Sequence, residues 1–419
     1  METRNSNYKW LALALLWVAF FLQQGTRQVF SATLSSIQGS LAVTPAQIGL
    51  VATIFTFAYG LSVPFAGVAA DLLNRKWMVV SGVFVFCLGI FASGFVSALG
   101  LLIVTYGLLN GFGQSFYYPS ATSIISQLHK ETRATALSIL QMGLYTGIIG
   151  CSAAAGFLAE SGTDGWRTAF RIFGGIGILW AVALVFLLKD TRPAKAQPQS
   201  LGDNTAAVPE RKASLGEAFG VFISNPAAVM LAVGLGMMIY VDVGFKTWMP
   251  NHLQDTFQLA KGPAALNAVL WHYLGAFVGV TLGGRISDQL VAKRPSVRME
   301  TNILGLACAV PFIVWMAYAP SLIACCVAMA LFGVFRGVYD SNLMASLFDI
   351  IPQRYHASGA GIMLCFGFVF GSTSPTVLGI LKERFSSATG LASLAAFYLA
   401  GAAVIFLARR VFFCRKKVA

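Results

Sequence analysis

Twelve apolar runs, each about long enough to cross a bilayer, make up most of this chain of 419 residues. A membrane-spanning helix needs about 20 mostly apolar residues. Hydrophobic residues account for 57% of the sequence and charged residues for 11%, and a soluble fold of this size could not hide that much apolar surface. We therefore expect an all-α integral membrane protein. The predicted spans are residues 8–36, 47–72, 77–97, 99–127, 135–159, 168–188, 226–251, 263–287, 301–319, 322–347, 358–381 and 388–408.

The basic residues predict how these spans are oriented. Of the 29 Lys and Arg residues, 21 lie in or beside the polar segments on the side of the two termini, and five lie in the opposite loops. Basic loops favour the cytoplasmic side of a membrane, so both termini are expected to be cytoplasmic. The expected location is the cytoplasmic (inner) membrane of a bacterium. Because the charges flank apolar runs and form no basic stripe, the net charge of +13 does not indicate nucleic-acid binding.

A polar segment, residues 189–225, divides the spans into two sets of six. It is rich in Pro, Ala, Ser and charged residues, a composition typical of a linker that cannot form its own core. The predicted domains are therefore an N-terminal six-helix bundle (1–188), a cytoplasmic linker (189–225), and a C-terminal six-helix bundle with a tail (226–419). We expect a monomer.

Signatures of enzymes and metal sites are missing from the sequence. There is no G-x-S-x-G, no P-loop lysine motif and no H-E-x-x-H, and the seven cysteines do not have metal-ligand spacing. We expect no enzymatic activity, no metal and no cofactor. Without a nucleotide-binding domain, energy for any transport would have to come from an ion or solute gradient.

An internal repeat relates the two halves. Gly67…Asp71…Asn74-Arg75-Lys76 follows the second span, and Gly284-Arg285…Asp288 follows the eighth. Similar motifs at equivalent spans predict a duplicated six-helix unit, hence two pseudo-symmetric bundles.

These residues resemble the major facilitator superfamily over the whole length of the chain. Residues 67–76 are similar to that superfamily's signature between spans two and three, G-x-x-x-D-R-x-G-R-R/K. Leu72 replaces the usual Arg, and Asn74 replaces the usual Gly, although Asn tolerates a left-handed turn. The resemblance implies two gates that lock the cytoplasmic helix ends, one at Asp71 and Arg75 and one at Arg285 and Asp288.

Shorter motifs indicate a branch of the superfamily. Residues 109–114, Arg27 in the first span, residues 189–193 and residues 248–250 resemble the organophosphate and the organic anion:cation symporter branches. The loop at 165–170 is shared more widely, including by sugar-acid and Spinster-like lipid transporters.

Five charged residues lie inside predicted spans: Arg27, Asp242, Lys246, Arg336 and Asp340. A charged side chain at mid-membrane costs about 2.5–3.5 kcal/mol, so each suggests a function. The alternative is structural, because Asp242/Lys246 and Arg336/Asp340 are i, i+4 pairs that could neutralise each other. Arg27 has no acidic neighbour at helical spacing.

Three cations against two carboxylates predict a positive cavity that favours an anion. Arg27 offers a planar donor fork for carboxylate or phosphate, assisted by Lys246 or Arg336. The repeat nominates Lys246 as the partner of Arg27, whereas the family pattern places Asp242 there, so either could face the site. Further candidates for substrate binding are the deep polar residues Gln114, Tyr118 and Tyr145.

A carboxylate at this depth is also suited to proton coupling, because its proton affinity changes as its surroundings open and close. Asp340 and Asp242 are the candidates, and His272 is a third, although a satisfied interior histidine is the favoured interpretation.

The combined prediction is a secondary active transporter of a small organic anion (a sugar acid, carboxylate or organophosphate), moved in symport with protons by alternating access. Its partners are that anion, protons and the lipid bilayer. Two alternatives remain open: a transporter-like sensor that binds the solute without net flux, and an exporter of an amphipathic lipid or drug.

Overall fold

Every regular element of the described residues is a helix in the computed structural model. The structure describes residues 2–129, 131–162, 164–190, 215–291, 293–294 and 296–415. The side chains of residues 2–7, 68, 71, 72, 134, 215, 357 and 412–415 also lie outside the described part.

The N-terminal half contains six membrane-spanning segments, the fourth of which is interrupted. It comprises α1 (Glu2–Leu41), α2 (Pro45–Leu72), α3 (Arg75–Ser93), α4 (Leu99–Leu102), η1 (Ile103–Asn110), α5 (Gly111–Ser115), α6 (Tyr117–Leu128), α7 (Arg133–Glu160) and α8 (Gly165–Leu187). The segment η1 is a π-helix, in which each hydrogen bond closes a wider turn than in an α-helix. Together α4, η1, α5 and α6 form the fourth span.

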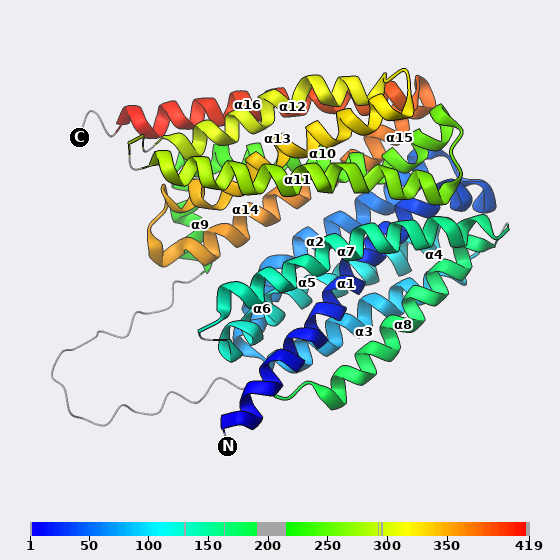
Figure 1. Ribbon diagram of the computed structural model, residues 1–419, viewed down its shortest axis with the longest axis horizontal. Helices are drawn as coiled ribbons and strands as arrows, with labels where there is room; N and C mark the ends of the chain where they lie inside the picture. Colours follow the sequence, from blue (N-terminus) through cyan, green and yellow to red (C-terminus); the bar gives the residue numbers. More distant parts are fainter. Residues whose placement is uncertain are drawn as a thin grey trace.

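The C-terminal half repeats this arrangement (Figure 1). It comprises α10 (Pro226–Phe257), α11 (Lys261–Val291), α12 (Val297–Ala317), α13 (Leu322–Phe348), η2 (Gln353–Tyr355), α14 (His356–Gly371), α15 (Ser374–Arg384) and α16 (Ser387–Arg415). Here the fifth span of the half is divided into α14 and α15.

Within the described part of the chain, eleven spans are long and apolar enough to cross a membrane by length and composition. The exception is α1, whose Gln23, Gln24, Arg27 and Gln28 lower its hydropathy. It packs along α7 inside the N-terminal half and supplies the twelfth span. The predicted all-α architecture of twelve helices in two six-helix bundles is confirmed.

Capping residues define several helix starts. Thr44 and Gln47 form a reciprocal capping box before α2, with Pro45 at the first helical position. The Asn74 side chain accepts a hydrogen bond from the Lys76 amide at the start of α3. Asn74 has φ −70° and ψ 116°, so the left-handed turn expected there is wrong: the residue acts as an N-cap in extended conformation.

The end of the polar linker contains one further helix. The segment α9 (Leu215–Ser224) buries Ala218 and Phe222 against its neighbours, while Phe219 and Ile223 are exposed. This helix was not predicted, since ten residues with two buried side chains cannot form a core and depend on packing against α10 and α14.

Glycines let helices within the C-terminal half approach each other closely. A Cβ at Gly275 or Gly279 of α11 would overlap the backbone carbonyls of Ala330 and Val334 on α13. A Cβ at Gly371 of α14 would meet Ile239 on α10. The glycines of α11 and of α14 therefore allow close packing of helices inside the C-terminal half.

The two halves meet along two helix pairs, α7 with α11 and α2 with α14 and α15. Hydrogen bonds between the halves gather at the end of the molecule opposite the termini, which we call the closed end. Ser35 bonds to Gln254 at 2.8 Å, and Thr53 bonds to Thr376 at 2.8 Å.

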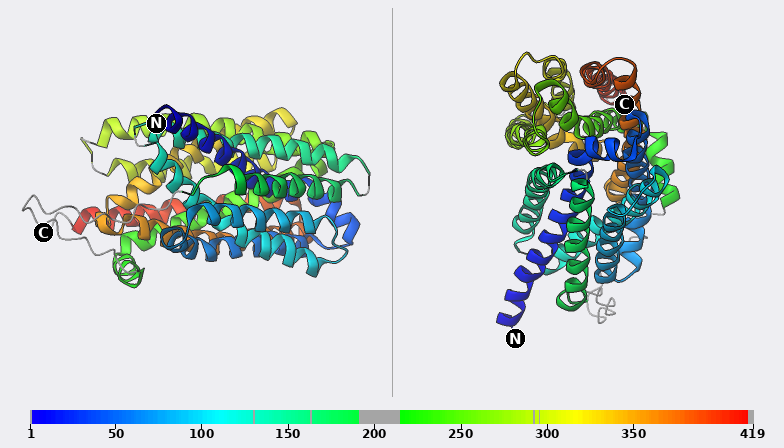
Figure 2. Two further views of the ribbon diagram at one scale, coloured as in Figure 1. Left: turned by 90° about the horizontal axis from the view of Figure 1, so that it is seen from below. Right: turned by 90° about the vertical axis from the view of Figure 1, so that its right-hand side faces the viewer.

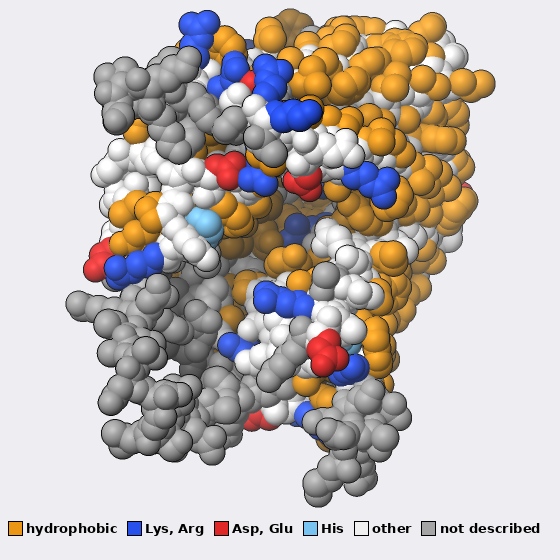
Figure 3. Space-filling view, turned by 60° about the vertical axis from the view of Figure 1, so that its left-hand side comes forward, with side chains coloured by type: hydrophobic (Ala, Val, Ile, Leu, Met, Phe, Trp, Pro, Cys, Tyr) orange, Lys and Arg blue, Asp and Glu red, His pale blue; other side chains and the backbone are white. Residues whose placement is uncertain are grey.

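The start of α1 and the end of α16 both lie at the other end, one on each half; we call this the open end (Figures 1 and 2). A space-filling view of this end shows a hollow between the halves, with Lys and Arg side chains around its rim (Figure 3). The cavity between the bundles therefore opens toward the end that carries both termini.

Candidate functional site

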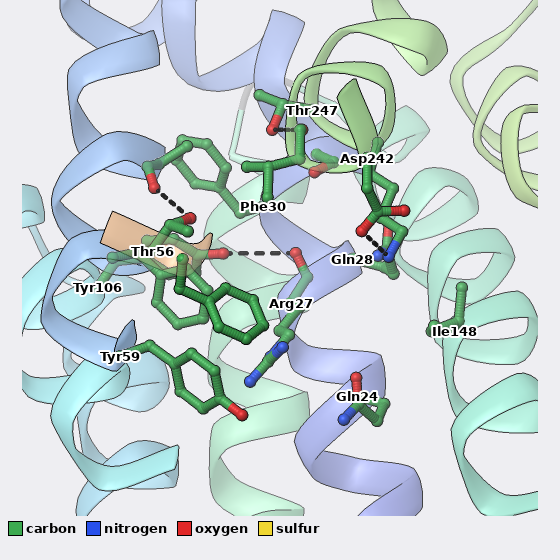
Figure 4. A pocket seen from close by; sticks show the side chains of 16 residues that line it. Gln24, Arg27, Gln28, Phe30, Thr56, Tyr59, Tyr106, Ile148, Asp242 and Thr247 are labelled. Carbon is green, nitrogen blue, oxygen red and sulfur yellow. Dashed lines mark hydrogen bonds and ion pairs between the residues drawn. The ribbon is translucent and has the colours of Figure 1, made fainter. Parts of the chain in front are cut away.

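A cavity lies between the halves, and its walls come from α1, α2, η1, α7, α10 and α14 (Figure 4). Its apolar part includes Phe30, Phe55 and Phe368. Its polar lining consists of Gln24, Arg27, Gln28, Ser31, Thr56, Tyr59, Tyr106, Asp242, Lys246 and Thr247.

Arg27 on α1 is held in this cavity by three contacts. Its Nε donates to Gln114 Oε1 at 2.5 Å. Its guanidinium carbon lies 4.4 Å from the ring centroid of Tyr59 and 5.6 Å from that of Phe55, within the range of cation–π attraction. Nη2 is buried and has no hydrogen-bond partner among the described residues, and none of the ion pairs there involves Arg27.

Gln114 positions Arg27 and does not itself line the cavity. The Gln114 side chain is fully buried, and its Nε2 donates to Asn110 Oδ1 at 2.8 Å. Its backbone carbonyl accepts from Gln23 Nε2 at 2.5 Å. Because the contact of Nε2 with Asn110 fixes the amide orientation, Gln114 presents Oε1 to the guanidinium. The structure therefore places Gln114 behind Arg27 and outside the cavity lining, where a contact with substrate was expected.

The other four intramembrane charges form one network across α10 and α13. Asp242 Oδ2 lies 2.7 Å from Lys246 Nζ, and Asp242 Oδ1 lies 2.5 Å from Arg336 Nη1. Arg336 Nε lies 3.4 Å from Asp340 Oδ2. Both i, i+4 pairs expected from the sequence are therefore present, and Asp242 bridges them.

His272 completes this network from α11. Its Nε2 lies 3.1 Å from Arg336 Nη1, and its ring packs against Phe245 and Phe332. The residue is fully buried, and its Nδ1 has no hydrogen-bond partner among the described residues, so its interior position fits the structural interpretation but its hydrogen bonding is only partly satisfied.

This pairing divides the three intramembrane cations into two kinds. Lys246 and Arg336 each contact a carboxylate, so their charges are compensated locally. Arg27 is held by a neutral amide and two aromatic rings. Of the alternatives left open for the partner position, Lys246 and Asp242 both line the cavity, joined to each other.

The two tyrosines proposed for substrate binding lie outside the cavity lining. Tyr118 on α6 is 43% exposed and packs against Phe20, with ring centroids 5.5 Å apart. Tyr145 on α7 contacts Tyr273 on α11 edge to face at 5.7 Å. Across the molecule, Tyr59 meets Phe368 in the same way at 4.9 Å, so one aromatic contact joins each helix pair between the halves.

The expected gating residues lie at the open end. Arg75 is the first residue of α3, and its Nη1 is buried without a hydrogen-bond partner in the described part; the side chain of Asp71 lies outside that part. Asp288 lies 4.0 Å from Arg298, which pairs with Asp349 at 2.8 Å. Arg285 is exposed, and the cation beside Asp288 is Arg298.

Several cavity residues were not identified from the sequence, among them Ser31, Thr56, Tyr59 and Thr247. Single hydroxyl groups are common in membrane helices, so they give little signal. A usable signal existed on α1, where Gln24 and Gln28 stand one turn apart beside Arg27. Among the described residues no group of three His, Cys, Asp or Glu side chains could hold a metal ion.

Comparisons with known proteins show which family this chain belongs to. A model of the Major Facilitator Superfamily matches residues 16–375. The chain is 24% identical to a probable sulfoacetate transporter of Cupriavidus necator, over 90% of this chain and 88% of the relative. It is 25% identical to the D-galactonate transporter of Escherichia coli, over 94% of each chain.

A solved structure shares the fold. It is a bacterial homologue of the human lysosomal transporter Spinster in an inward-facing and unoccupied conformation, with a TM-score of 0.85 and 20% identity, covering 97% of this chain and 98% of that one. The family model spans most of the twelve helices, and the cavity lies between their two halves. The chain therefore belongs to the Major Facilitator Superfamily and is a membrane transporter rather than an enzyme.

Proposed function

We propose that this protein is a secondary active transporter of a small organic anion, coupled to protons and working by alternating access. The observation that carries the proposal is Arg27, a cation in the cavity between the halves whose contacts are a neutral amide and two aromatic rings. A partly buried cation inside the membrane without a carboxylate is costly, and a bound anion would relieve that cost.

The chemistry of the guanidinium supports an anionic substrate. With Nε bonded to Gln114, the two terminal nitrogens remain to bind a carboxylate, sulfonate or phosphate end-on. Gln24, Gln28 and Thr56 supply neutral donors and acceptors nearby, which suit the hydroxyl groups of a sugar acid. The names of two relatives, for sulfoacetate and for D-galactonate, denote organic anions of this kind.

Asp340 is the better candidate for proton exchange. Asp242 contacts two cations at 2.5 and 2.7 Å, so protonating it would disrupt the whole network. Asp340 has one longer contact, 3.4 Å, and its side chain is 33% exposed against 13% for Asp242. A proton can therefore reach Asp340 while the core of the network stays intact.

The open end is proposed to be cytoplasmic, in the inner membrane of a bacterium. The excess of Lys and Arg on the side of the termini supports this orientation, and the rim of the hollow carries such residues (Figure 3). Asp71 with Arg75, and Asp288 with Arg285 and Arg298, would then gate the cytoplasmic side.

The test is uptake of radiolabelled D-galactonate, a hexuronate and sulfoacetate into proteoliposomes with an imposed proton gradient. The expected result is uptake of at least one of these anions by the wild type and by Arg410→Ala, which removes an exposed arginine outside the cavity. Arg27→Ala should lose uptake completely, since the Arg27 guanidinium is the main contact with the anion.

Two results would contradict this proposal. Undiminished uptake by Arg27→Ala would show that Arg27 does not bind the anion. Binding of an anion by the purified protein without any uptake would favour a solute sensor over a transporter.

A further inference from the structure

Two glutamates at the closed end make the same contact on opposite sides of the molecule. Glu160, the last residue of α7, accepts a hydrogen bond at Oε1 from the amide of Gly262, 2.7 Å away at the start of α11. Glu383, near the end of α15, accepts one at Oε1 from the amide of Ala46, also 2.7 Å away, at the start of α2. Each bond joins one half of the protein to the other.

The two contacts are related by the internal repeat. The fifth span (α7) and the second part of the eleventh (α15) occupy equivalent places, as do the second span (α2) and the eighth (α11). In both cases the acceptor is bonded to the second residue of the facing helix, Ala46 after Pro45 and Gly262 after Lys261. Each carboxylate therefore lies at a helix N-terminus, where amide groups and the helix dipole favour negative charge.

A glycine four residues earlier makes each approach possible. The motifs are Gly156-Phe-Leu-Ala-Glu160 and Gly379-Ile-Leu-Lys-Glu383. A Cβ at Gly156 would lie 2.7 Å from the Lys261 carbonyl oxygen and 2.8 Å from Gly262 Cα. A Cβ at Gly379 would overlap the carbonyl oxygen of Pro45 and lie 2.9 Å from Ala46 Cα. One face of the helix end thus carries both the space for the facing helix and the acceptor for its amide.

The placement of these glutamates has no explanation within their own helices. A carboxylate in the last turn of a helix faces the negative end of that helix's dipole, which is unfavourable. The cost is offset when the N-terminus of another helix lies beside it. Since that helix belongs to the other half, the favourable contact exists only while the halves are together at this end.

We propose that the two G-x-x-x-E motifs, Gly156–Glu160 and Gly379–Glu383, are paired latches that hold the closed end shut and release together when the transporter opens there. Their role rests on the proposed alternating access, because a latch matters only if the closed end opens during the cycle. Both side chains are exposed to solvent, so each latch is weak enough to release. Together they bias the equilibrium between the two conformations.

The test measures the conformational equilibrium without any substrate. Spin labels are attached at Gly39→Cys in the N-terminal half, where nothing lies within 4 Å of an added Cβ, and at Phe385→Cys in the C-terminal half, which is 69% exposed. The seven native cysteines are replaced by alanine. Pulsed electron paramagnetic resonance then gives the fraction of molecules with a separated closed end.

Removing either carboxylate, in Glu160→Ala or Glu383→Ala, should raise the ratio of separated to joined molecules about twofold to fivefold, and the double variant should multiply the two effects. Asp164→Asn is the matched control, since its partner Arg167 lies in the same half. Gly379→Ala should shift the ratio further than either, because its clash is with backbone; Gly100→Ala, with nothing within 4 Å of the added Cβ, should not.

An unchanged distance distribution in the double variant would overturn the proposal that the two motifs hold the closed end shut. A shift produced by only one of the two glutamates would overturn their pairing. The spin-label distances are measured without any substrate. Failure of the anion proposal in the uptake assay would therefore leave this test of the latches intact, and failure of the latch proposal would leave the assignment of Arg27 intact. The glutamate variants alter exposed side chains, so they decide the matter even if Gly379→Ala does not fold.

Discussion

Gln114→Glu tests the anion site by replacing one amide nitrogen with oxygen. The new carboxylate would stand where Gln114 Oε1 now accepts from Arg27 Nε at 2.5 Å, so it would pair with the guanidinium without any movement of the backbone. The cation would then be neutralised from within, and the cavity would lose the net charge that attracts an anion.

The size of the effect follows from charge and distance. An anion bound to the terminal nitrogens of Arg27 would lie about 6 Å from the new carboxylate, and at an effective dielectric of about 20 the repulsion is about 3 kcal/mol. This corresponds to an increase of about a hundredfold in Kd.

The assay is calorimetric titration of the purified protein near neutral pH with whichever anion shows uptake. Gln114→Met is the matched variant, because it removes the hydrogen bond and adds no charge; its expected loss is about tenfold, the value of one hydrogen bond of about 1.4 kcal/mol. If folded Gln114→Glu binds the anion as tightly as the wild type, Arg27 does not hold the anion and the reasoning fails.

Three further perturbations probe the network and the packing. Asp340→Asn should make anion uptake independent of an imposed proton gradient, whereas Glu131→Gln, at an exposed site, should keep the dependence; a preserved response in Asp340→Asn would refute its role. Asp242→Asn should lower stability by about 3 kcal/mol, because it leaves Lys246 and Arg336 without their shared carboxylate; thermal unfolding in detergent measures this, and a Tm equal to that of wild type would mean that the cations find other partners. Gly279→Ala should lower stability by about 1–3 kcal/mol through overlap with the Val334 carbonyl, while Gly284→Ala, whose nearest neighbour is 3.9 Å away, should not; equal Tm values for the two would refute close packing at Gly279.

The fold was predictable because the membrane imposes simple requirements on the sequence. Apolar length defines the spans, and the repeated motifs at 67–76 and 284–288 show the two halves. The intramembrane charges were also visible, since a charge such as Arg27 is costly in an apolar run. Local pairing of Asp242 with Lys246 followed from helical spacing.

Contacts between distant helices were not predictable. The ion pair between Asp242 and Arg336 joins residues on α10 and α13, and nothing in either segment specifies which faces meet. Gln114 illustrates the same limit: its depth was evident, but whether it touches substrate or supports Arg27 depends on how the fourth span is rotated. The G-x-x-x-E motifs escaped notice because each glutamate acts on a backbone amide, which has no sequence signal.

The π-helical segment η1 (Ile103–Asn110) sets that rotation. It precedes Gln114 by one turn, and its wide turns take up more residues than a regular helix would need over the same length. Because these wide turns absorb surplus residues, deleting one residue there would make the helix regular and leave Gln114 facing Arg27, whereas deleting one residue of the regular helix α5 ahead of Gln114 would rotate everything beyond it by about 100°. The fourth span can therefore gain or lose a residue within η1 and still direct the same amide at the same arginine, whereas a change of length within α5 would turn that amide away from it.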